Sequence, residues 1–188
     1  DKRNQKFQTT SGFFSRYSVD IPVVSDTNTL RNTYNYKIFK ELYDDNVSTF
    51  SFLLKSSNSI SGDNVKLSER LYIPGRRLRG FEAGKVGPKD GGDYVGGNYI
   101  STLNATSTVP NFLENVQNVD VVMFADVGKI WGVDYNSSLE TDEIRSSVGL
   151  GIDWLTTIGP LTFSFAHPIT QAESDVTETF RFNLGTSF

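Results

Sequence analysis

The chain has 188 residues, with 37% hydrophobic and 13% aromatic content, no cysteine, a formal net charge of −4 and a pI near 5.0. No run approaches the roughly 18 consecutive apolar residues of a transmembrane helix, which excludes a helical membrane protein. The acidic balance argues against nucleic acid as a partner, because phosphate binding requires a basic surface. Without cysteine there is neither a disulfide framework nor a thiolate metal site.

Apolar and polar residues alternate with a two-residue period along eight segments, which is typical of β-strands with one apolar and one polar face. In residues 118–131, for example, Val121 and Met123 alternate with Asp120 and Asp126. Residues 95–108 show the weakest alternation, because they are mostly Thr, Ser, Asn and small residues. The eight predicted strands are residues 12–24, 28–40, 46–57, 95–108, 118–131, 144–156, 160–168 and 177–188.

The length of these strands favours a membrane β-barrel over a soluble β-sandwich, which also alternates apolar and polar residues. Sandwich strands usually have about five or six residues, whereas a tilted strand needs about 9–11 residues to cross the hydrocarbon. The last segment ends on the aromatic Phe188, which suits a strand that stops at the lipid–water interface. We therefore predict an all-β fold: residues 1–188 form a single antiparallel transmembrane β-barrel domain with both termini on one side of the membrane.

The polar faces of the predicted strands carry charges of both signs, which favours a solvated or internally paired lumen over an ion-selectivity ring. A Ser-His-Asp hydrolase would have to use His167, the only histidine, and nothing near it in sequence supports that role. The sequence shows no metal-ligand cluster and no phosphate-binding loop before a helix. We expect a protein that is not an enzyme and needs no cofactor. The lumen-facing charges are Arg16, Asp20, Arg31, Lys37, Lys55, Asp120, Arg145, Asp153 and Arg181.

Residues 59–94 are too long for a hairpin loop and too rich in glycine and charge for a packed strand, and loops of this length are usually functional. The motif Leu78-Arg79-Gly80-Phe81 lies here, followed by Gly87-Pro88 and Gly96-Gly97-Asn98. These elements resemble the (V/L)RG(F/Y) motif and following glycines in the sixth extracellular loop of the BamA family of outer-membrane protein assembly factors. The resemblance extends over the whole chain, through residues 124–131, 159–166 and 180–188.

This resemblance implies that the chain is the last eight strands of a sixteen-stranded barrel that follows periplasmic POTRA domains. It implies a location in the bacterial outer membrane and a part in an insertase that folds and inserts other outer-membrane proteins without ATP. The implied partners are the lipid bilayer, unfolded outer-membrane protein clients, and other assembly-machine subunits bound through POTRA domains that this chain lacks. A half barrel has two unpaired edges, so it closes on itself, pairs with a second copy, or forms part of a larger barrel.

The resemblance also implies roles for single residues. The motif arginine, Arg79, points into the lumen and bonds to Asp126, although Arg79 could instead be one solvated arginine of a basic loop. The family usually has a second carboxylate on the preceding strand, where this chain offers only Asn104 or Thr106, so the charge cluster is incomplete in sequence.

The last strand carries two further implied features. Gly185 matches a glycine at which the last strand kinks at a lateral gate, or it is simply a small packed residue. The aromatic pattern ending at Phe188 resembles the C-terminal β-signal of outer-membrane proteins, although an ordinary lipid-facing strand predicts the same residues.

Two other functions stay open at this point. One is a TamA-like or two-partner-secretion transporter barrel, although the long glycine-rich stretch after the motif favours the BamA family. The other is a stand-alone small barrel that acts as a passive pore or adhesin. An Arg79 side chain held against Asp126 would favour the first hypothesis, whereas a loop 59–94 splayed into solvent would favour the stand-alone barrel.

Overall fold

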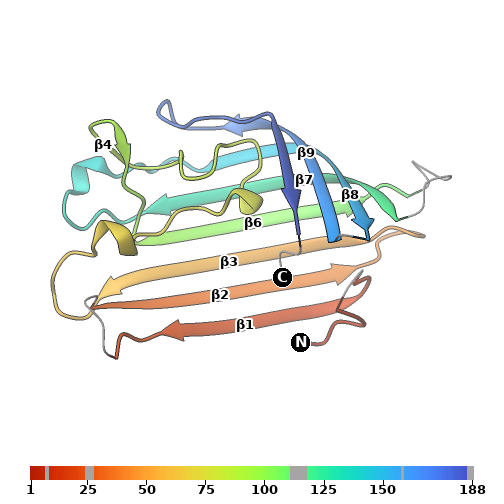
Figure 1. Cartoon of the computed structure of the whole chain (residues 1–188), viewed down its shortest axis with the longest axis horizontal. Helices are drawn as coiled ribbons and strands as arrows, with labels where there is room; N and C mark the ends of the chain where they lie inside the picture. Colours follow the sequence, from red (N-terminus) through yellow and green to blue (C-terminus); the bar gives the residue numbers. More distant parts are fainter. Residues whose placement is uncertain (7–8, 24–27, 111–117, 158, 186–188) are drawn as a thin grey trace.

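The computed structural model describes residues 1–6, 9–23, 28–110, 118–157 and 159–185. These residues form one eight-stranded antiparallel sheet in the order β1-β2-β3-β6-β7-β8-β9-β10 (Figure 1), which confirms the predicted all-β, antiparallel fold. No helix in the described ranges is long and apolar enough to cross a membrane. The strands of the sheet are β1 (Gly12–Asp20), β2 (Thr29–Lys40), β3 (Ser48–Ser59), β6 (Tyr99–Thr108), β7 (Val119–Trp131), β8 (Arg145–Thr156), β9 (Gly159–Thr170) and β10 (Phe180–Leu184).

The sheet is open at both sides. Within the described ranges, β1 pairs only with β2 and β10 only with β9. Antiparallel pairing places the long connections, residues 60–98, 132–144 and 171–179, at one end of the sheet. This is the arrangement expected for a segment of an outer-membrane barrel, in which long loops gather on one side.

Several strand boundaries differ from the prediction by a few residues, and the differences at the fourth and last predicted strands concern the long loop and the chain's last strand. The strand predicted from residue 95 begins at Tyr99, because Gly96 turns the chain with φ +68° and Gly97 pairs with Leu71 of the loop instead of with the sheet. The last strand is assigned over Phe180–Leu184, shorter than the predicted 177–188, and Phe188 lies outside the described residues.

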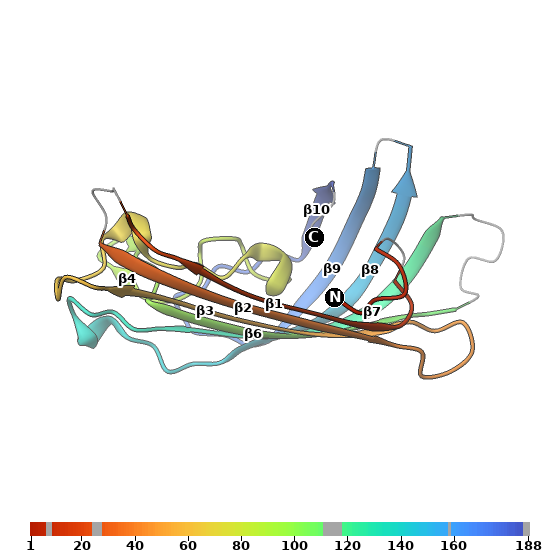
Figure 2. The same cartoon turned by 90° about the horizontal axis from the view of Figure 1, so that it is seen from below.

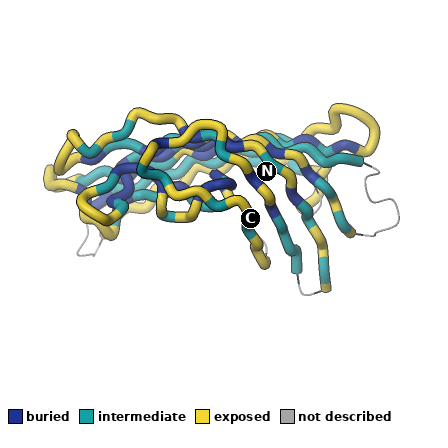
Figure 3. Tube along the Cα trace, turned by 90° about the horizontal axis from the view of Figure 1, so that it is seen from above, coloured by how far each residue is buried: buried dark blue, intermediate teal, exposed yellow. Residues whose placement is uncertain are grey.

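The sheet is bent (Figures 2 and 3). The convex face presents apolar side chains, and aromatic residues pair across strands on it: the ring centroids of Phe165 and Phe180 are 5.0 Å apart, and those of Tyr99 and Trp131 are 5.6 Å apart. Such a face suits a lipid environment. Its exposed apolar side chains include Phe50, Leu54, Leu103, Met123, Val127, Val148, Leu150, Trp154, Phe165, Phe180, Phe182 and Leu184.

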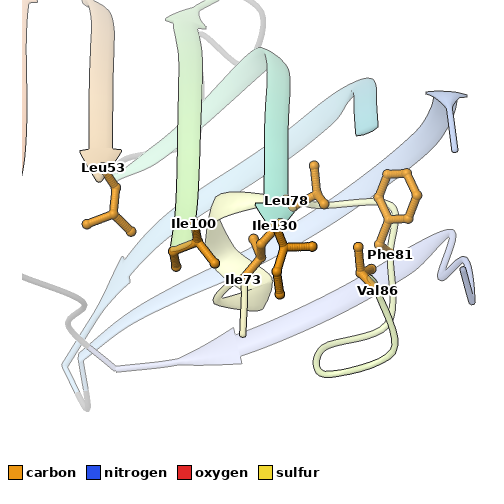
Figure 4. Close-up of a cluster of buried hydrophobic side chains, with 7 residues drawn as sticks. All are labelled: Leu53, Ile73, Leu78, Phe81, Val86, Ile100 and Ile130. Carbon is orange, nitrogen blue, oxygen red and sulfur yellow. The ribbon is translucent and has the colours of Figure 1, made fainter. Parts of the chain in front are cut away.

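The concave face is covered by the long loop, residues 60–98. This loop contains two 3-10 turns, η1 (Leu67–Glu69) and η2 (Gly75–Arg77), and the short pair β4 (Lys89–Asp90) and β5 (Asp93–Tyr94), whereas η3 (Ser137–Leu139) lies in the next long connection. The buried core forms between loop and sheet (Figure 4) and consists of Leu53, Ile73, Leu78, Phe81, Val86, Ile100 and Ile130. Apolar side chains on the otherwise polar face of the strands therefore pack against the loop.

Candidate functional site

The turn η2 brings the motif of the long loop onto the concave face. Its backbone closes through the Arg77 N–H, which donates to the Pro74 carbonyl at 2.8 Å. Leu78, directly after the turn, is buried in the core. Arg77 and Arg79, on either side of Leu78, reach polar groups of the strands beneath. The loop is thus held on the sheet by apolar packing and by two arginines.

Arg79 and Asp126, the predicted anchor pair, are in direct contact. The Nε and Nη2 atoms of Arg79 donate to the two carboxylate oxygens of Asp126 at 2.8 and 2.7 Å, and its backbone N–H donates to the same carboxylate at 3.0 Å. Asp126 lies on β7 and is 0% exposed. The guanidinium also lies 3.4 Å from the ring centroid of Phe124. A bidentate, charge-assisted ion pair and a cation–π contact together fix the position of the arginine side chain.

A neutral amide, Asn104 of β6, lies beside this ion pair. The Asn104 Nδ2 atom donates to Asp126 Oδ1 and to the backbone carbonyl of Arg77, both at 2.8 Å. Thr106 contributes only a long contact of 3.5 Å from Arg79 Nη2. Arg79 therefore pairs with one carboxylate, and Asn104 joins that carboxylate to the loop backbone.

Arg77 is a second buried arginine, which the sequence did not reveal because it reads as a solvated neighbour in a basic run. Arg77 is 8% exposed, and its guanidinium donates to neutral oxygens of Ser51 at 2.7 Å, Asn35 at 2.9 Å and Asn104 at 3.2 Å. Burial, and next the positive charge of Arg76, lower the pKa of the Arg77 guanidinium. Arg77 is thus held by hydrogen bonds and forms no ion pair with a carboxylate in the described part of the chain.

The motif glycine Gly80 and the predicted loop glycines Gly87 and Gly97 lie where the loop backbone touches the sheet, whereas the third predicted loop glycine, Gly96, packs against Leu71 and Tyr72 of the loop itself. Gly80 has φ +91° and packs on β8 and β9. Gly87 has φ +108°, and a Cβ atom there would lie 2.7 Å from Ile130 Cγ2. A Cβ on Gly97 would lie 2.5 Å from the carbonyl oxygen of Trp131. Only glycine permits this close approach, so these positions set how deeply the loop sits on the sheet.

The motif also binds the segment that leads into the last strand. Phe81, buried at 1% exposure, forms a β-bridge with Thr177, and the Glu178 N–H donates to the Gly80 carbonyl at 3.0 Å. From β10, Arg181 Nη2 donates to the Phe81 carbonyl at 2.6 Å, and its Nε donates to Glu178 at 2.9 Å. The loop and the beginning of β10 are therefore one hydrogen-bonded unit.

A buried ion pair, which the sequence pattern did not identify, joins a third element to the loop. Arg145 on β8 and Asp175 meet at 2.8 Å, and the side chains of both are 0% exposed. Asp175 also accepts the backbone N–H groups of Gly87 at 3.1 Å and Ala172 at 2.7 Å. Arg145 was expected in the lumen, but Asp175 lies in a connection, where residue spacing carries no information about its partner.

The predicted gate position, Gly185, follows directly after β10. It has φ +108°, its N–H donates to the Pro160 carbonyl at 2.9 Å, and a Cβ atom there would meet nothing within 4 Å. The backbone leaves extended geometry at this residue while it still pairs with the neighbouring strand. The other predicted gate residue, Phe188, lies outside the described residues.

Comparison with known proteins finds relatives of this chain. Among curated relatives, BamA of Neisseria meningitidis serogroup B is 29% identical over 174 residues, covering 74% of this chain and 22% of that protein. BamA of Neorickettsia risticii is 27% identical over 169 residues, covering 87% and 22%. A SAM50-like protein of Schizosaccharomyces pombe is 27% identical over 141 residues, covering 70% and 29%. The chain thus spans about a fifth of the length of the BamA relatives.

A solved structure has the same fold. The crystal structure of BamA from Haemophilus ducreyi lacking POTRA domains 1–3 superimposes with a TM-score of 0.86 at 24% identity, covering 97% of this chain and 40% of that one. The sheet therefore has the fold of part of a BamA barrel. The family model described as the Omp85 superfamily domain matches residues 1–188. This chain belongs to the Omp85 superfamily.

Proposed function

We propose that the chain is the C-terminal half of the barrel of an outer-membrane protein assembly insertase, which folds and inserts other outer-membrane proteins. The observation that carries this proposal is the Arg79–Asp126 pair, which holds the long loop on the concave face of the sheet. The names of three relatives, each an outer membrane protein assembly factor BamA, support the same activity. Its location is the bacterial outer membrane.

The activity proposed here is one of binding and folding, with no covalent chemistry and no cofactor. The apolar convex face contacts the lipid bilayer, and unfolded outer-membrane proteins are the clients. Other assembly-machine subunits act through POTRA domains in the remainder of a longer protein. Strand β10, which Gly185 follows directly, forms one side of a lateral gate, and the sequence from Phe180 carries the β-signal pattern.

Different observations bear on the two alternative functions. A stand-alone eight-stranded pore or adhesin requires a closed barrel, and within the described ranges the edges β1 and β10 do not pair with each other. A loop splayed into solvent, expected for that alternative, is also absent from the described residues, because the loop packs on the sheet. A TamA-like or two-partner-secretion transporter has no feature of this structure in its favour over the assembly factor.

The proposal is tested with Arg79→Ala in the full-length protein. The substitution leaves the buried Asp126 carboxylate without its cation, which typically costs about 3–5 kcal/mol. We expect a lower unfolding temperature, measured by heat-modifiable gel mobility, together with reduced client insertion into proteoliposomes.

The control is Lys129→Ala on the same strand. It breaks the 3.4 Å pair with the fully exposed Asp142, and pairs of this kind contribute little. Wild-type client insertion by the Arg79→Ala protein would overturn the proposed role of the anchored loop.

A further inference from the structure

A polar cavity of about 180 Å³ lies between the turn η2 and the inner face of β2, β3 and β6. Four cationic side chains line it, and no acidic side chain is among its lining residues in the described part of the chain. The cations are Lys37 of β2 and Arg76, Arg77 and Arg79 of the loop. The whole chain carries a net charge of −4, so this gathering of cations is a local feature and not an effect of composition.

The four cations are not equally neutralised. Arg79 pairs with Asp126 and occupies both of its carboxylate oxygens. Among the described residues, the guanidinium of Arg77 donates only to neutral oxygens. Lys37 and Arg76 form no ion pair with any described residue. Two positive charges therefore face the cavity without a counter-charge, and a third is only solvated by amide and hydroxyl groups.

Like charges that share a partly buried space repel one another more strongly than they would in bulk water. The repulsion is removed when a group of opposite charge enters and accepts their hydrogen bonds. Thr49 and Thr106 add hydroxyl groups to the same wall, so the cavity offers both charge and neutral donors. Its volume suits a single carboxylate or phosphate group and is too small for a nucleotide.

We propose that this cavity is an oxyanion-binding site, in which Lys37 and Arg76 bind a carboxylate or phosphate group beside Arg77. Two sources can deliver this chemistry. One is a free anion such as inorganic phosphate, and the other is an acidic side chain from a part of the protein outside this chain. The site is independent of the Arg79–Asp126 anchor, whose carboxylate is already fully engaged.

The proposal is tested by whether substitutions at the cavity lower or raise the unfolding temperature. If an oxyanion occupies the cavity, Lys37→Gln and Arg76→Gln each remove one of its ligands and lower the unfolding temperature by about 2 °C or more. If the cavity holds no anion, the same substitutions relieve repulsion and leave the unfolding temperature unchanged or raise it. Arg76 is exposed, so Arg76→Gln reports on the site even if Lys37→Gln impairs folding.

The measurement uses the full-length protein in detergent micelles, in sodium chloride and in sodium phosphate of equal ionic strength. Lys40→Gln is the matched control, because Lys40 lies on the same strand, is exposed and is absent from the cavity lining. A loss of stability in both buffers assigns the oxyanion to an acidic side chain of the protein, and a loss only in phosphate assigns it to the free anion. No loss in either buffer, or an equal loss for Lys40→Gln, would overturn the site.

Discussion

At the scale of single residues, Asp126 is the point at which the loop, β6 and β7 are joined. Its position on the polar face could be predicted from strand alternation, and its link to Arg79 was implied by the resemblance of the loop motif to the BamA family. The contacts that Asn104 and Arg77 make could not be predicted. An amide on a weakly alternating strand and an arginine within a basic run show no sequence pattern that separates them from solvated residues.

Gly87→Ala is a residue-scale test of how the loop sits on the sheet. Alanine at φ +108° is strained, and its Cβ would lie 2.7 Å from Ile130 Cγ2, so we expect a loss of about 1–3 kcal/mol in the free energy of unfolding. Denaturant unfolding in micelles measures it. Gly84→Ala is the control, because Gly84 also has a positive φ but meets nothing within 4 Å. An equal loss for both variants would show that backbone strain alone acts, and that contact with the sheet does not matter.

At the scale of elements, the strands followed closely from the two-residue period, whereas the course of the loop did not. Leu53, Ile100 and Ile130 interrupt the polar face of their strands, and this is the one sequence signal that something apolar covers them. The covering segment could not be identified from alternation, because loop residues have no fixed period. The late start of β6 has the same origin, since Gly97 pairs with the loop.

The attachment of β10 to the loop gives an element-scale prediction. Arg181→Met removes the charge-assisted hydrogen bonds to the Phe81 carbonyl and to Glu178, and bonds of this kind contribute about 1.5–3 kcal/mol. We expect amide hydrogen exchange of residues 178–184 to accelerate by about tenfold or more. Exchange along β3, far from this contact in the sheet order, should stay unchanged.

Arg16→Met on β1 is the matched control, because it makes the same substitution on the opposite edge strand, where Arg16 has no ion pair among the described residues. If residues 178–184 exchange at the same rate in both variants, Arg181 does not hold β10 to the loop.

At the scale of the whole molecule, the sheet has an apolar convex face, a polar concave face covered by one loop, and two edges without partners within the described ranges. The apolar and polar faces could be predicted, because the identity of each residue indicates which face it occupies, whereas the covering of the polar face by the loop could not be predicted from alternation. Closure could not be predicted, because the hydrogen-bonding groups at a sheet edge belong to the backbone and are the same for nearly every residue type. The chain spans about a fifth of the length of its BamA relatives.

The most direct measurement of the central claim, that the motif-bearing loop lies on the inner face of a membrane sheet, is a disulfide between Leu78→Cys and Gly128→Cys. The chain has no cysteine of its own, and a Cβ atom at position 128 would lie 3.5 Å from Leu78 Cδ1. In native outer membranes under mild oxidation, we expect this pair to cross-link and the pair Leu78→Cys with Val127→Cys, on the lipid-facing side of the same strand, not to. Free thiols at 78 and 128, or equal cross-linking of the two pairs, would contradict the account.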